Sequence, residues 1–70
     1  MKNGGAKWVV IHIAHSEERA ARASELLERE GFLVRVNPIA RSITADPCFE
    51  VQALSCEAQE ARDLLQENGF

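Results

Sequence analysis

The sequence predicts a small α+β domain whose elements follow in the order β-α-β-β-α. Three observations carry this prediction: three runs of strand character, two segments with helical Ala/Leu spacing, and a Gly-Phe pair that closes each helical segment. The strand runs are short and end at polar or turn-forming residues, as half-buried strands do. Seventy residues suit one domain, which we expect to span 7–70 after a flexible tail at 1–6.

The first two elements are a strand at 7–14 and the helix that follows it. The strand reads KWVVIHIA, a run rich in β-branched residues. Ser16 is a favoured N-cap, and the two glutamates after it suit the positive end of the helix dipole. At the other end, Gly31 can adopt the left-handed conformation that stops a helix, and Phe32 can then pack back on the last turn. We therefore expect a helix between Ser16 and Gly31.

Two more strands and a second helix complete the order. The run FLVRVNPI (32–39) alternates in polarity, and its Pro38 cannot donate a ladder hydrogen bond. That strand should therefore end at Pro38 or lie at a sheet edge. The run CFEVQAL (48–54) alternates in the same way. Ser55 is then expected to cap a helix over 56–68, which ends in the second Gly-Phe pair.

The two β-α halves resemble each other when 10–32 is aligned with 48–70. The residues of the first half that have an identical counterpart are Ala20, Ala23, Leu26, Leu27, Gly31 and Phe32. Internal duplication explains this likeness, and so does the shared need of two helices to pack on one sheet. Either way, the pattern predicts a ferredoxin-like split β-α-β arrangement that lacks the last strand. Its three strands would form an antiparallel sheet in the order first-third-second, with both helices on one face.

The alternation assigns each strand residue to a face of that sheet. The core face is expected to carry Val9, Ile11, Ile13, Phe32, Val34, Val36, Phe49, Val51 and Ala53. The open face is expected to carry Trp8, Val10, His12, Leu33, Arg35, Cys48, Glu50 and Gln52. On the central strand, Glu50 should then lie between His12 and Arg35. These three residues, with Arg41 from the 38–47 loop, are candidates for a small-molecule or anion site. The same three residues also fit cross-strand pairing that keeps an exposed face soluble.

The strand at 7–14 would lie at the edge of a three-stranded sheet. It is apolar and contains no proline and no internal lysine, and edges of this kind pair readily with another strand. We therefore expect a homodimer or a protein partner along this edge, with Trp8, Val10 and His12 in the interface. The alternative is that the 1–6 tail or the local twist shields the edge.

Metal and nucleophile sites are not expected. His12 and His15 would lie on opposite faces of a strand, and Cys48 and Cys56 lack the compact spacing of metal-binding cysteines. The serines show no nucleophile elbow, and no cofactor motif is present. The sequence therefore predicts a protein without metal, cofactor or catalytic residues.

Nucleic acid and membrane are not expected as partners either. RNA-binding sheets carry aromatic residues at central positions, where this chain has His12, Glu50 and Gln52, and no basic cluster surrounds them. No apolar run approaches the roughly 20 residues that span a bilayer. The start of the chain lacks the apolar stretch of a signal peptide, so we expect a cytoplasmic protein.

The stretch ASELLEREGFLVRVNPI (23–39) resembles a family of short bacterial proteins grouped as signal-transducing domains of unassigned function. The likeness of layout extends over 7–69, and it implies a regulatory or interaction role without catalytic residues. Some similar short sequences carry the name glutamate decarboxylase. Pyridoxal-phosphate chemistry needs a Schiff-base lysine in a dry pocket, whereas Lys2 and Lys7 lie in or beside the tail. We therefore expect a non-enzymatic interaction domain, with a small-molecule sensor as the alternative.

Overall fold

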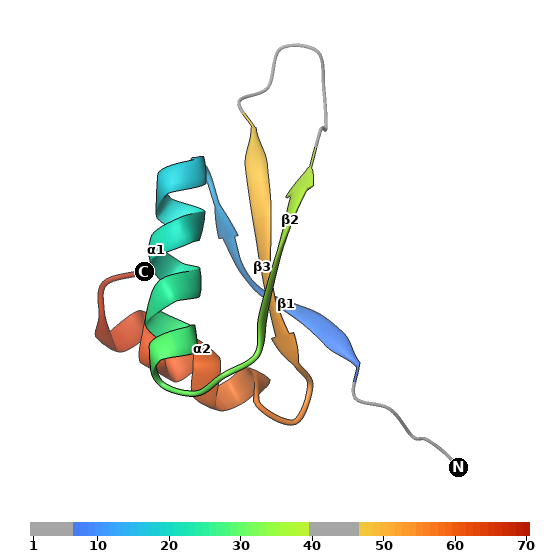
Figure 1. Ribbon diagram of the computed structural model, residues 1–70, viewed down its shortest axis with the longest axis vertical. Helices are drawn as coiled ribbons and strands as arrows, with labels where there is room; N and C mark the ends of the chain where they lie inside the picture. Colours follow the sequence, from blue (N-terminus) through green and yellow to red (C-terminus); the bar gives the residue numbers. More distant parts are fainter. Residues whose placement is uncertain (1–6, 40–46) are drawn as a thin grey trace.

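The predicted fold class is confirmed. In the computed structural model, residues 7–39 and 47–70 are described, and they form five elements (Figure 1). The elements in chain order are β1 (Trp8–Ala14), α1 (Glu17–Arg29), β2 (Val34–Ile39), β3 (Cys48–Leu54) and α2 (Ala58–Glu67). The sheet order is β1-β3-β2, and β3 is antiparallel to both neighbours. Because β1 and β2 are both antiparallel to β3, they run parallel to each other. Two parallel strands with a third strand between them form the split β-α-β arrangement.

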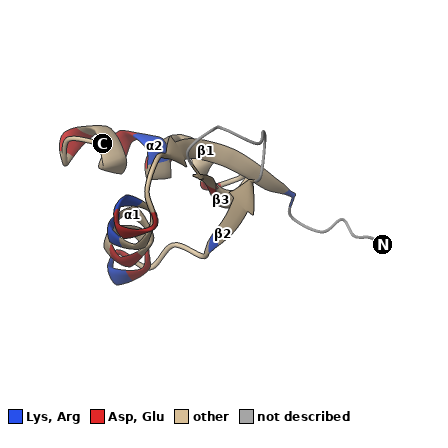
Figure 2. Ribbon diagram, turned by 90° about the horizontal axis from the view of Figure 1, so that it is seen from above, with Lys and Arg blue, Asp and Glu red and all other residues tan. Residues whose placement is uncertain are grey.

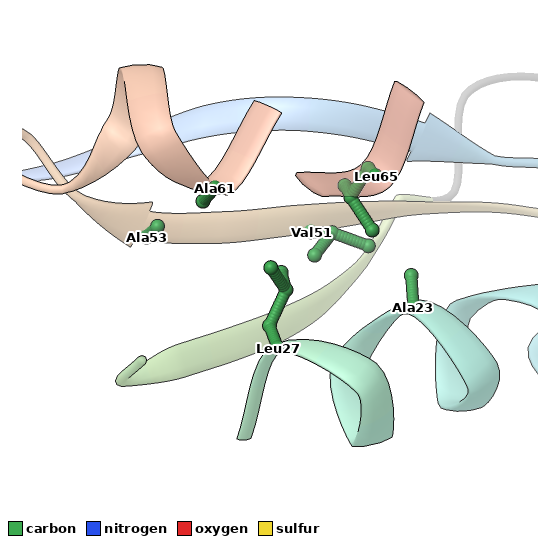
Figure 3. Close-up of a cluster of buried hydrophobic side chains, with 6 residues drawn as sticks. All are labelled: Ala23, Leu27, Val51, Ala53, Ala61 and Leu65. Atoms are coloured by element: carbon green, nitrogen blue, oxygen red, sulfur yellow. The ribbon is translucent and has the colours of Figure 1, made fainter. Parts of the chain in front are cut away.

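Both helices lie on one side of the sheet and leave its other side uncovered (Figure 2). α1 packs on β2 and β3, and α2 packs mainly on β1. The core lies where the two helices meet the central strand. α1, β3 and α2 each contribute two side chains that are at most 2% exposed (Figure 3). These side chains are Ala23, Leu27, Val51, Ala53, Ala61 and Leu65. Neither described helix is long and apolar enough to cross a membrane.

Both helices end as the Gly-Phe pairs predict. Gly31 has a φ of 94° and Gly69 a φ of 86°, in the left-handed region that favours glycine. The Phe32 N–H donates to the Leu27 carbonyl at 3.0 Å, and the Gly31 N–H donates to the Glu28 carbonyl at 3.0 Å. These two bonds define a Schellman motif, and α2 repeats both of them through Gly69 and Phe70. Phe32 and Phe70 then pack against the core.

The first helix also begins as predicted. The Ser16 Oγ accepts the backbone N–H of Arg19 at 3.1 Å, so Ser16 is the N-cap of α1. On the exposed side of α1, Arg22 donates to Glu18 at 3.3 Å in an i,i+4 ion pair. The cap and this pair both stabilise the N-terminal half of α1.

The predicted cap of the second helix is wrong. The Ser55 N–H donates to the Lys7 carbonyl at 2.7 Å, which extends the β1–β3 ladder by one residue. The chain then turns, and the helix begins only at Ala58 with Glu57 as an N-cap that makes no side-chain bond. Ser55 is therefore held by the sheet, and Cys56 is exposed in the turn instead of in the first helical turn.

A β-bulge in β1 overturns part of the predicted face assignment. The pairing of β1 with β3 shifts register at Ile11, which is the extra residue. Beyond it, His12 lies opposite Val51 and Ile13 lies opposite Glu50. Val51 is fully buried under the helices, so His12 faces the helices, whereas Ile13 faces the open side and is 40% exposed. The strict two-residue alternation that assigned His12 to the open face and Ile13 to the core does not continue through a bulge.

Candidate functional site

The predicted site on the open face does not assemble. The Glu50 Oε1 accepts hydrogen bonds from the Asn37 Nδ2 at 3.3 Å and from the Gln52 Nε2 at 3.0 Å. His12 is on the other side of the sheet, and Arg35 lies opposite Gln52 rather than opposite Glu50. The Glu50 carboxylate is therefore held by two neutral amides. It forms a polar centre on the open face, bonded to Asn37 and Gln52 instead of lying between His12 and Arg35 as the sequence predicted.

The loop part of the predicted site cannot be placed. Arg41 lies outside the described residues, as does most of the 38–47 loop. Of the four candidate ligand-binding residues, Arg35 and Glu50 are on the open face and His12 is not.

Arg35 contacts an aromatic ring instead of a carboxylate. Its guanidinium carbon Cζ lies 5.3 Å from the centre of the Trp8 ring, so the two side chains meet over the open face from opposite edges of the sheet. Trp8 is 36% exposed. A cation–π contact at such an exposed place stabilises by about 0.5–1 kcal/mol. Arg35 therefore covers part of the Trp8 ring.

Arg35→Ala is expected to lower the free energy of unfolding by less than about 1 kcal/mol, because the residue is exposed and loses one cation–π contact. Urea unfolding followed by the fluorescence of Trp8, the single tryptophan, measures this change and the altered surroundings of the ring. Arg62→Ala, at an exposed position of α2, is the control. A loss of several kcal/mol would show that Arg35 is buried.

β1 presents an apolar stripe to the open face. Trp8, Val10 and Ile13, which we call the β1 stripe, are between 36% and 40% exposed. The sequence predicted Trp8 and Val10 in this role, whereas Ile13 takes the place expected for His12 because of the bulge. Sequence reasoning missed Ile13, since no glycine or proline marks the bulge.

The two edges of the sheet differ. β2 is one edge, as Pro38 predicted, and it carries that proline within its pairing with β3. Proline has no N–H to offer a further strand, so it blunts an edge. β1 is the other edge, and within residues 7–39 and 47–70 its second side pairs with no strand. It carries neither proline nor a charged residue.

The His12 side chain, on β1, faces the helices. Its ring meets the Phe70 ring edge-on, with 5.9 Å between the centroids and 89° between the planes. Burial lowers the pKa of His12 below its ordinary value, and the positive charges of Arg19 and His15 lower it further. The imidazole is therefore held in its neutral form more firmly than an exposed histidine would be.

A polar cavity of about 360 Å³ lies between the start of α1 and the end of α2. Its lining consists of Ser16, Glu18, Arg19, Arg22, Asn68, Gly69 and Phe70. Sequence reasoning did not assign a site to these residues. The spacing of Arg19 and Arg22 places both on one side of a helix, but only the fold brings residues 68–70 beside them.

The thiols and imidazoles do not form a metal cluster in the described part of the chain. The Cys48 Sγ lies 3.7 Å from the His15 Nδ1, whereas Cys56 is exposed, and neither cysteine is in a disulfide bond. Across the described ranges, no three His, Cys, Asp or Glu side chains converge in a way that could hold a metal ion.

Comparisons with family models, with curated proteins and with solved structures found no match. Function is therefore inferred from the geometry of the chain.

Proposed function

We propose that this protein is a small, non-enzymatic interaction domain that forms a homodimer by pairing the β1 edges of two copies. The observation that carries the proposal is the difference between the two sheet edges. Pro38 blunts β2, whereas β1 is an apolar edge without proline or charge. An edge of the β1 kind is stabilised when a second strand satisfies its outward backbone groups.

A two-fold axis beside β1 would make the contact self-complementary. The two β1 strands would run antiparallel, and the sheet would continue from one copy into the other. Because the β1 stripe lies on the open face, the two stripes would meet across the new strand pair. Trp8, Val10 and Ile13 would then lose part of their present exposure to water, which favours association.

The bulge at Ile11 sets the expected strength of this dimer. A bulge bends its strand and increases the local twist, which limits how far a second strand can follow the edge. We therefore expect a small interface, below about 1,200 Å² of total buried surface, of the kind found in transient complexes. Reversible pairing of this strength suits a regulatory role, since the protein concentration would control the state of assembly.

Val10→Lys is expected to weaken self-association, because two copies would bring like charges together across the β1 pair. Sedimentation equilibrium up to millimolar protein measures the dimer fraction. Leu33→Lys is the matched control, since Leu33 is 59% exposed and precedes β2. It should leave the dimer unchanged. A wild-type protein that stays monomeric at millimolar concentration would exclude the β1 dimer.

Amide hydrogen exchange separates edge pairing from other modes of contact. Pairing along β1 should slow exchange of outward β1 amides as concentration rises, while β2 amides serve as an internal reference. Equal slowing on both edges would contradict the proposal. If the protein is monomeric but binds an extended peptide along β1, the edge binds a different partner by strand addition, and the homodimer is excluded.

The alternative of a sensor that uses the open face and the 38–47 loop has less support. The Glu50 carboxylate already accepts bonds from Asn37 and Gln52, and His12 does not reach it. The polar cavity between the helices is a better place for a ligand.

A further inference from the structure

The cavity between the start of α1 and the end of α2 carries two arginines on its wall. Arg19 and Arg22 come from one side of α1, and Asn68, Gly69 and Phe70 come from the end of α2. A second hollow of about 300 Å³ continues along α1 and shares Arg22, Asn68 and Phe70 with the first. Its lining also includes Glu25, Leu26 and Arg29, so the hollowed surface follows the helix and carries a glutamate as well as arginines.

The charged side chains of this wall are two arginines and one glutamate. The single side-chain carboxylate, that of Glu18, is bonded to Arg22 at 3.3 Å. Arg19 has no carboxylate partner within ion-pair distance in the described chain. Its positive charge acts on the neighbouring interior, since it contributes to the lowered pKa of His12. An arginine without a counter-ion beside a cavity is a ready partner for an oxyanion.

The remaining polar groups of the wall add one free donor. The Ser16 Oγ accepts the Arg19 backbone N–H at 3.1 Å, which leaves its hydroxyl proton free to donate. The Asn68 Nδ2 is engaged, because it donates to the Leu64 carbonyl at 2.8 Å. Phe70 supplies an apolar side to the cavity. The site can therefore hold an anionic group at Arg19 and Ser16 and a small apolar portion near Phe70.

We propose that this cavity binds a small metabolite through an oxyanion group, a phosphate or a carboxylate, held by Arg19 and Ser16. Arg22 joins them by exchanging Glu18 for the ligand. The volume of about 360 Å³ is near the lower end of ligand sites, which run from about 300 to 1,000 Å³, so the ligand is small. The site is independent of the proposed β1 dimer, because its residues come from the start of α1 and the end of α2 and none of them lies on β1.

Titration with inorganic phosphate, and separately with acetate, tests the site. Sodium chloride keeps the ionic strength constant, and NMR follows the side-chain Nε–H signals of Arg19 and Arg22. We expect saturable shifts at both arginines and at the Ser16 amide. Tighter binding of phosphate would assign a phosphate-bearing ligand, and tighter binding of acetate a carboxylate. No saturable response to either anion would overturn the proposal.

Two variants show whether the response is specific. Arg19→Gln removes a charged hydrogen bond and should weaken binding about tenfold or more. Arg62→Gln removes the same charge from an exposed position on α2 that does not line the cavity, and it should leave binding unchanged. Equal weakening in both variants would mean that the anion responds only to net charge, and the site would be rejected.

His12 offers a second readout inside the protein. A bound anion offsets the charge of Arg19, so the pKa of His12 should rise toward its ordinary value. The groups that act on this ring are Arg19, His15 and the Phe70 ring. Sulfate is the probe here because it does not titrate near neutral pH. The pKa rise should be lost in Arg19→Gln, and persistence of the rise in that variant would contradict the assignment to Arg19.

Discussion

Leu27→Ala is expected to lower the free energy of unfolding by about 2–5 kcal/mol, the largest effect of any single truncation proposed for this chain. Leu27 is fully buried, and its side chain packs between the helices and the central strand with Val51 and Leu65 (Figure 3). Removing it leaves a cavity at the meeting point of α1, β3 and α2. Circular dichroism without denaturant measures the folded fraction of the variant, and urea unfolding followed by Trp8 fluorescence measures the loss if a folded baseline remains.

A domain of this size has only about 3–5 kcal/mol of stability in total. The alanine variant is therefore expected to be largely unfolded without denaturant, and Leu27→Met, which conserves volume, should cost less than about 1.5 kcal/mol. Leu33→Ala is the surface control, because Leu33 is 59% exposed, and it should change stability by no more than about 0.5 kcal/mol. Equal losses at Leu27 and Leu33 would contradict the core described above.

Gly31→Ala is expected to cost about 1–2 kcal/mol through backbone strain alone. Gly31 has a φ of 94°, and an added Cβ would meet no heavy atom within 4 Å. A steric clash therefore cannot explain a loss, and the left-handed backbone can. Gly69 offers a second test of the same idea, since its φ is 86° and its surroundings are equally open. Chemical unfolding of both variants measures the two costs.

Asparagine tolerates left-handed backbone better than alanine does, so Gly31→Asn should cost less than Gly31→Ala. This order separates the backbone effect from any effect of adding a side chain. An alanine variant as stable as the wild type would show that the turn rearranges, and that the Schellman bonds of Phe32 and Leu27 contribute little.

Local signals were sufficient for most of the fold. The strand at 48–54 appears in the structure with the predicted bounds, and Ser16, Gly31 and Gly69 act as the sequence indicates. The cap at Ser16 and the turns at Gly31 and Gly69 depend on interactions within a few residues of the chain. Ser55 shows where local signals fail: its cap preference competes with a sheet hydrogen bond to Lys7, which is distant in sequence. The sheet bond prevails, and the helix starts later.

The candidate site was less predictable than the fold. Arg35 and Glu50 lie on the predicted face, yet their partners are Trp8 and two amides, which the alternation of a strand does not specify. The cavity with Arg19 was not predicted because it joins the first turns of α1 to the end of α2. Such a juxtaposition depends on how two helices pack over one sheet.

The amino-acid order was enough to establish the β-α-β-β-α layout and the two Schellman ends, because periodicity, caps and glycine act over short distances. The sheet order was predicted from the split β-α-β arrangement that this layout favours. Tertiary structure alone decided that His12 faces Phe70 and that Ile13 faces the open side. The physical reason is the bulge at Ile11: one unpaired residue in the β1–β3 ladder reverses the faces of the residues after it, and the pairing partner lies in another part of the chain.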